Sequence, residues 1–236
     1  MFKKIEPIDK IKHNGLRFAP GSDLTFARKL SFVPLGAREI FLASRYYPIV
    51  FPLDGVAVPQ ALLSLRKEHN SYINAEGKWI VPYVPMHVRR YPFLLASPTP
   101  AGQEKGEVGK LVLCIDRDAE NFKTEEGEPL FDEKGEPGKT TATAIEMLRQ
   151  FQGDLKACEK LFQQLDEQGC LITKQAKIEN EGVSLGSFRV VDFARVQELD
   201  DAVLAGWVRN GLLGLAYALN FSLANFDRFG TKIKVV

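Results

Sequence analysis

The sequence predicts an α+β protein, in which a β-rich part over 1–138 with short, mostly antiparallel strands packs with a mainly helical part over 139–236. Two patterns lead to this prediction. The first 120 residues hold short apolar runs bounded by Pro, Gly and charged residues, whereas apolar residues recur at helical spacing after 139. With 236 residues, 45% of them hydrophobic, the chain is long enough to bury a sizeable core. We therefore expect a single domain over 1–236.

Short apolar runs mark the expected strands of the first part. Their shortness and their flanking prolines favour strands over buried helices, which are usually longer. The last two of these runs flank a polar loop at 98–109. The runs are 40–43, 49–51, 61–65, 91–96 and 110–116.

The helical part begins with two expected amphipathic helices. Apolar residues mark the first at 145–151. Asp154 is placed to cap the start of the second, over 155–165, and Gly169 to end it.

A strand at 183–191 is expected to separate these two helices from a second helical pair. Asp192 or Asp200 could cap the segments that follow, and Gly211 breaks the chain before the apolar run 212–226.

Charge and cysteine content exclude several classes of protein. The formal net charge of +1 argues against a nucleic-acid binder. Basic residues exceed acidic ones in 1–100, and acidic residues exceed basic ones in 101–139. The two segments could attract each other within the fold. Alternatively, the acidic segment could be a binding loop. Three cysteines without close pairs do not make a disulfide framework.

The sequence gives two expectations about location. The start of the chain has no apolar stretch typical of a secretory signal, so a cytoplasmic protein is the default expectation. Residues 202–226 carry a single formal charge, Arg209, but asparagines and glycines interrupt them. We therefore expect a buried helical pair and no transmembrane insertion.

Some segments match catalytic sequence motifs, but the other residues that the chemistry requires do not accompany them. Residues 182–186 match G-x-S-x-G, but that nucleophile elbow needs a later histidine, and the three histidines are His13, His69 and His87. Asp116 and Asp118 end an apolar run and could hold a divalent cation, although the same pattern ends many surface strands. We expect neither a metal nor a cofactor.

The most unusual segment is 70–93, which is rich in aromatic residues, prolines and arginines. Residues 74–77 predict a turn, with Gly77 supplying a positive φ. The prolines that follow favour an extended backbone, on which the adjacent Arg89 and Arg90 would point to opposite sides.

This segment resembles the SapC family of bacterial proteins, which is named for a surface-layer locus. The resemblance extends over nearly the whole chain and implies a component associated with a surface layer or cell envelope, but it carries over no catalytic residues. A cell-surface location would then require export by a route other than a signal peptide. The supporting pieces are 46–51, 113–116 and 129–137.

Two hypotheses about function follow. We favour a non-enzymatic binding or assembly protein whose partner is a protein, a peptide, a small molecule or a second copy of the chain. Aromatic and Arg side chains dominate interaction hot spots, so the candidate ligand-binding residues are Trp79, Tyr83, Arg89, Arg90 and Tyr91. The alternative interpretation of these residues is that the aromatics are core and the arginines pair internally.

The second hypothesis is an enzyme, or an enzyme accessory, that acts on a peptide or a modified amino acid. Arg89 or Arg90 would then anchor a substrate carboxylate. His87, Asp116 or Asp132 would supply polar support or proton transfer.

Overall fold

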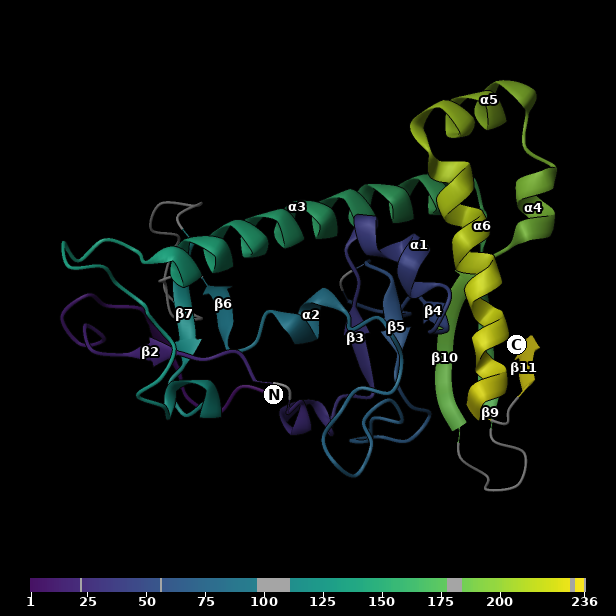
Figure 1. Ribbon diagram of the computed structural model, residues 1–236. Helices are drawn as coiled ribbons and strands as arrows, with labels where there is room; N and C mark the ends of the chain where they lie inside the picture. Colours follow the sequence, from purple (N-terminus) through teal and green to yellow (C-terminus); the bar gives the residue numbers. More distant parts are fainter. Residues whose placement is uncertain (22, 56, 97–110, 178–183, 230–231, 236) are drawn as a thin grey trace.

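The computed structural model describes residues 1–236 except 22, 56, 97–110, 178–183, 230–231 and 236. The predicted α+β class is confirmed: short antiparallel sheets fill the first half, and helices dominate the second (Figure 1). The expected polar loop at 98–109 lies outside the described residues.

The strands of the first half are two to five residues long, and all their pairings are antiparallel. They form the sheets β1-β7-β6 and β3-β5-β4 and the pair β2-β8. Four of the five expected strands are present in shortened form, at 49–50, 60–62, 93–96 and 112–116. The strands are β1 Ile5–Pro7, β2 Arg17–Phe18, β3 Phe32–Pro34, β4 Ile49–Val50, β5 Gln60–Leu62, β6 Phe93–Ala96, β7 Val112–Asp116 and β8 Glu128–Pro129.

The strand expected at 40–43 is wrong, because Ile40–Ala43 is helix α1. This helix continues a 3-10 turn. Glu39 fixes the start of that turn, because its carboxylate accepts a hydrogen bond from the Gly36 N–H at 2.9 Å. The buried residues of this helix, Ile40 and Ala43, are three positions apart, which is helical spacing. In a run of four apolar residues, this spacing cannot be told from the alternation of a strand.

The extended backbone expected at Arg89 and Arg90 is also wrong. Met86–Arg89 forms helix α2, and the N–H groups of Val88 and Arg89 donate to the Pro85 carbonyl. Because successive residues of a helix are about 100° apart, the two arginines point in different directions but not to opposite sides. The predicted turn at 74–77 is present, with Gly77 at a φ of 78°.

One helix of 29 residues, α3 (Lys139–Glu167), replaces the two helices expected at 145–151 and 155–165. Asp154 therefore caps no helix; its carboxylate accepts from the Arg38 Nε–H at 2.9 Å instead. Gly169, with a φ of 64°, follows the end of α3 as predicted.

The remaining elements form a sheet and a helical lobe. The sheet has the order β10-β9-β11, and only β10 was expected from the sequence. Asp192 caps α4 by accepting from the Arg195 N–H, and Gly211, with a φ of 81°, separates α5 from α6. The elements are β9 Leu171–Lys177, β10 Ser184–Val191, α4 Phe193–Gln197, α5 Asp201–Asn210, α6 Leu212–Ser222 and β11 Lys232–Val235.

Helix α3 connects two hydrophobic clusters and runs along the molecule from the β6–β7 end to the helical lobe (Figure 1). Its first half contributes Ala144 and Leu148 to a cluster that includes Phe93 and Ile115. Its second half contributes four residues to the largest cluster, which also holds the β3-β5-β4 sheet and α6. These residues are Cys158, Leu161, Phe162 and Leu165.

Candidate functional site

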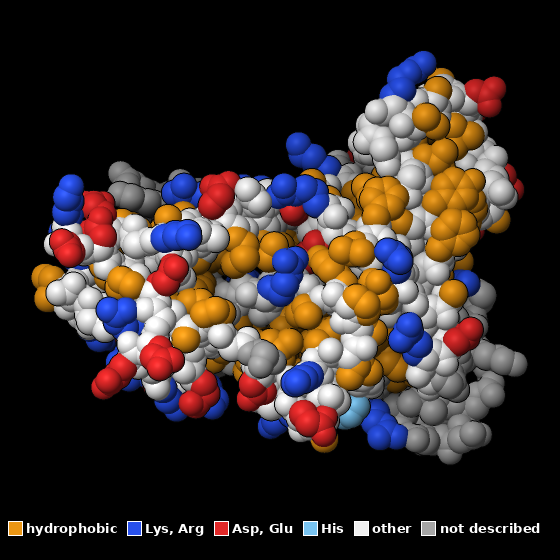
Figure 2. Space-filling view, in the orientation of Figure 1, with side chains coloured by type: hydrophobic (Ala, Val, Ile, Leu, Met, Phe, Trp, Pro, Cys, Tyr) orange, Lys and Arg blue, Asp and Glu red, His pale blue; other side chains and the backbone are white. Residues whose placement is uncertain are grey.

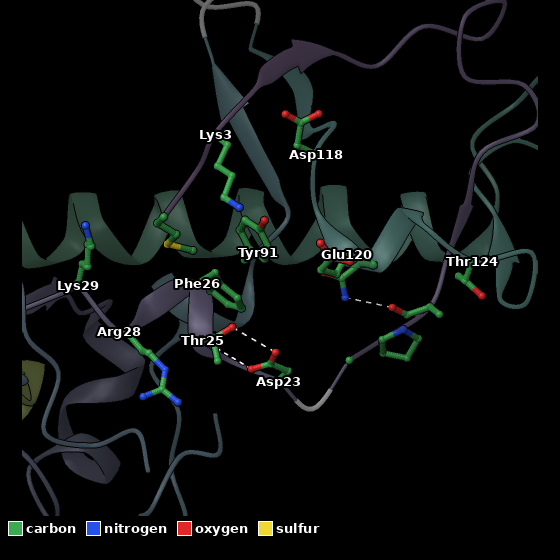
Figure 3. Close-up of a pocket in the computed structure, with 15 residues that line it drawn as sticks. Lys3, Asp23, Thr25, Phe26, Arg28, Lys29, Tyr91, Asp118, Glu120 and Thr124 are labelled. Atoms are coloured by element: carbon green, nitrogen blue, oxygen red, sulfur yellow. Dashed lines mark hydrogen bonds between the residues drawn. The ribbon is translucent and has the colours of Figure 1, made fainter. Parts of the chain in front are cut away.

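A wide cavity lies between the N-terminal segment, the 3-10 helix Thr25–Ala27 and the turn after β7. Its volume of about 730 Å³ falls in the range of small-molecule sites. Tyr91 and Phe26 form its apolar wall, with ring centroids 4.0 Å apart and an angle of 20° between the ring planes. We call it the aromatic cleft, and Figure 3 shows these two rings at its centre.

A buried carboxylate holds the Tyr91 side chain in place. The Tyr91 hydroxyl donates to Asp116 Oδ2 at 3.1 Å, and Asp116 also accepts from the N–H groups of Lys3 and Lys4 at 2.8 and 2.9 Å. Burial works to raise the pKa of Asp116, but these hydrogen bonds outweigh it, so the carboxyl pKa is lowered. Burial and the Asp116 charge raise the pKa of Tyr91, which stays a neutral hydroxyl.

Charges of both signs surround the two rings. Lys3, Lys29 and Asp118 line the cleft and form no side-chain hydrogen bond or ion pair within the described part of the chain. By contrast, Arg28 is already engaged, because its Nη2 donates to the carbonyls of Asn74 and Ala75. Figure 3 places Lys3 and Asp118 on one side of Tyr91, opposite Arg28. The cleft can therefore contact a ligand that carries both charges.

Trp79 and Tyr83 pack against the largest core cluster and do not line the cleft. The Trp79 indole N–H donates to the Tyr47 hydroxyl at 2.7 Å. The Tyr83 hydroxyl donates to Glu39 Oε1 at 2.5 Å, and burial together with Glu39 raises its pKa. Both aromatic residues thus make partly buried hydrogen bonds at the edge of the core.

The two arginines have different surroundings. Arg89 is exposed, donates from Nε to the Val84 carbonyl at 2.8 Å and lies over the Tyr83 ring. Arg90 is half-buried, and its guanidinium lies 5.3 Å from the centre of the Phe2 ring. No described residue accepts a hydrogen bond from its buried Nε.

The polar residues predicted to support the site are divided among three places. Asp116 joins Tyr91 behind the aromatic cleft, and His87 lines a second, smaller cavity together with Arg90. Asp132 lies in an exposed turn after β8, where it accepts from the N–H groups of Lys134 and Glu136. Among the described residues, no group of three or more His, Cys, Asp or Glu side chains could hold a metal ion.

Sequence reasoning missed most of the cleft. Lys3, Phe26 and Lys29 come from the N-terminal segment, far from Tyr91 along the chain. Phe26 lies in the short stretch Leu24–Ala27, which has no pattern that separates it from an ordinary core residue. Only the antiparallel pairing of β1 with β7 brings Lys3 close to Asp116.

A second notable surface is apolar. Large hydrophobic side chains are exposed on α1, α5 and α6, and Figure 2 shows them gathered over the helical lobe. No single described helix has the length and hydrophobicity to cross a membrane, although α5 and the segment Leu212–Phe229 pass that test as a pair bent by 85°. The exposed residues are Phe41, Leu42, Val208, Tyr217 and Phe221.

These features define an α+β protein with a cleft whose wall is aromatic and whose lining carries both charges. The sequence model of the SapC family matches residues 8–229, so the chain belongs to the SapC family. None of the curated proteins gives a significant match. None of the solved structures does either.

Proposed function

We propose that the protein is a binding component of the bacterial cell envelope or surface layer, and that its aromatic cleft takes a peptide-like ligand with both charges. The observation that carries the proposal is the stacked Tyr91–Phe26 pair in a cavity of about 730 Å³. Aromatic faces supply apolar contact area, and the unpaired Lys3, Lys29 and Asp118 supply partners for a carboxylate and an amine. The envelope context rests on the family name.

The cleft supports binding better than catalysis. A general acid or base works best with a pKa near the working pH. The Tyr91 hydroxyl has a pKa above its ordinary value of 10, and Asp116 is occupied by backbone N–H groups. The alternative is an enzyme or enzyme accessory that acts on a peptide or a modified amino acid. Neither Tyr91 nor Asp116 offers it a general acid or base with a pKa near the working pH.

Titration with the dipeptide Gly-Phe tests the proposed ligand class. We expect saturable binding by calorimetry, weakened at least tenfold by Phe26→Leu because the ring that stacks on Tyr91 is lost. Capping the dipeptide at either end should weaken binding, because each cap removes one charge. Phe32→Leu is the matched control, since Phe32 is 53% exposed on β3 and lies outside the cleft.

Two results would contradict this proposal. Equal loss of affinity in both variants would show that the cleft is not the binding site. Hydrolysis of Gly-Phe that Phe26→Leu abolishes would favour the enzyme alternative instead.

A further inference from the structure

A second cavity lies beneath α3, where the two hydrophobic clusters meet. Its volume is about 180 Å³, well below that of a drug-sized pocket. Leu148 of the second cluster and Leu155, which packs against the largest cluster, both line it. It shares no lining residue with the aromatic cleft.

Three polar side chains face this otherwise apolar cavity. They are Arg90 at the end of α2, His87 one turn earlier and Gln152 on α3. None of the three makes a side-chain hydrogen bond to any described residue, and of their polar atoms Arg90 Nε is buried. Buried polar groups are normally hydrogen-bonded, so the Arg90 Nε–H without an acceptor requires an explanation.

The charge of the cavity selects an anion. The Arg90 guanidinium carries a positive charge, and no acidic residue lines the cavity. Arg90 is half-buried and stacks on the Phe2 ring, but its buried Nε–H has no acceptor among the described residues. Leaving a buried charged donor without a hydrogen bond costs free energy, which an anion binding there would recover. A planar guanidinium matches the two oxygens of a carboxylate in particular.

We propose that this cavity binds a small carboxylate with a short apolar tail. The carboxylate pairs with Arg90 and accepts from His87 or Gln152, and the tail contacts Leu148, Phe151 and Leu155. The small volume limits the ligand to a few heavy atoms. This inference does not depend on the function proposed for the aromatic cleft.

Titration of ¹⁵N-labelled protein with butyrate at constant ionic strength tests the proposal. We expect saturable shifts of the Arg90 Nε–H and His87 ring signals with butyrate. Much smaller shifts are expected with 1-butanol and none with butylammonium, because neither has a carboxylate. Equal shifts with all three probes would overturn the proposal.

Two variants locate the carboxylate. Arg90→Gln should weaken butyrate binding at least tenfold, whereas Arg89→Gln on the same helix should leave it unchanged, because Arg89 is exposed and outside the cavity. Arg90→Gln should change the melting temperature little, since its buried Nε has no described hydrogen-bond partner and the contact with the Phe2 ring is the interaction lost. Unchanged butyrate affinity in Arg90→Gln would overturn the assignment.

A third variant keeps the test decisive if Arg90→Gln does not fold. Leu155→Phe fills the apolar side, so it should weaken butyrate binding more than acetate binding. N-acetyl-dialanine also has a free carboxylate, but its peptide chain is longer than the tail of butyrate. It should therefore bind more weakly than butyrate in a cavity of about 180 Å³. The reverse order would overturn the limit on ligand size.

Discussion

At the scale of single residues, the buried carboxylate of Glu39 organises the segment that precedes α2. It accepts from the Tyr83 hydroxyl and from the N–H groups of Met86 and Gly36, at 2.5, 2.6 and 2.9 Å. These bonds connect the 3-10 turn before α1 to the start of α2. A single side chain therefore holds the start of α2, the helix that carries Arg89, against the turn before α1.

Glu39→Ala should lower the free energy of unfolding by about 3 kcal/mol or more, because it leaves buried N–H donors without an acceptor. Urea unfolding measures this change. Arg38→Ala is the control, and it should cost less than about 1 kcal/mol because Arg38 forms an ion pair at the surface. Similar costs in the two variants would contradict the role given to Glu39.

His87 should make stability depend on pH. Burial, followed by repulsion from Arg90 and the terminal amine, lowers its pKa to about 3. An unfolded histidine has a pKa of about 6.5, so between these values the unfolded state binds more protons. Stability is therefore lost as the pH falls below about 6.5, by up to about 1.4 kcal/mol per pH unit.

His87→Gln should remove this loss. Relative to the parent protein, the variant should gain up to about 2 kcal/mol between pH 7.5 and pH 5, as measured from urea midpoints. His69→Gln, which changes an exposed histidine, is the control for the loss of an imidazole side chain. Parallel pH curves for the parent protein and His87→Gln would refute the prediction.

At the scale of elements, α3 shows how packing outweighs local signals. Gly153 and Asp154 look like the start of a new helix, yet the helix continues through them because both of its halves bury apolar residues. A glycine inside a helix costs about 1 kcal/mol, which is less than the burial of one large side chain. The helix therefore tolerates Gly153.

Gly153→Ala should raise the free energy of unfolding by about 0.5 to 1 kcal/mol, because an added Cβ meets no atom within 4 Å. Gly36→Ala is the opposite case, since its Cβ would lie 2.7 Å from the Asp154 Cβ. Thermal unfolding of both variants measures the difference. Stabilisation by Gly36→Ala would show that the loop before α1 does not approach α3 this closely.

The sequence could predict the fold class and most strands of the first half, but not the site. Short runs such as 40–43 fit a strand and a helix equally well, and a segment rich in proline favours extended backbone although Pro85 directly precedes α2. The aromatic cleft and the smaller cavity join residues that lie far apart in the chain, such as Phe26 with Tyr91. Spacing along a sequence cannot reveal such contacts.

At the scale of the whole molecule, α3 contributes residues to both clusters, so we expect the two clusters to unfold together. Arg149→Pro should cost about 3 kcal/mol or more and uncouple them, because proline would break the helix at an exposed position between Leu148 of one cluster and Cys158 of the other. Hydrogen exchange should then show peptides from β6 and β7 opening before those from β3 and β5. Arg149→Ala should leave the two regions opening together.

The length of α3 also has an architectural consequence. At 1.5 Å per residue, its 29 residues span about 43 Å. The helix therefore works as a strut that keeps the β1-β7-β6 sheet and the apolar lobe of α4 to α6 at a constant separation (Figure 1). In any ordered array of such molecules, that strut would set the spacing between one kind of surface and the next.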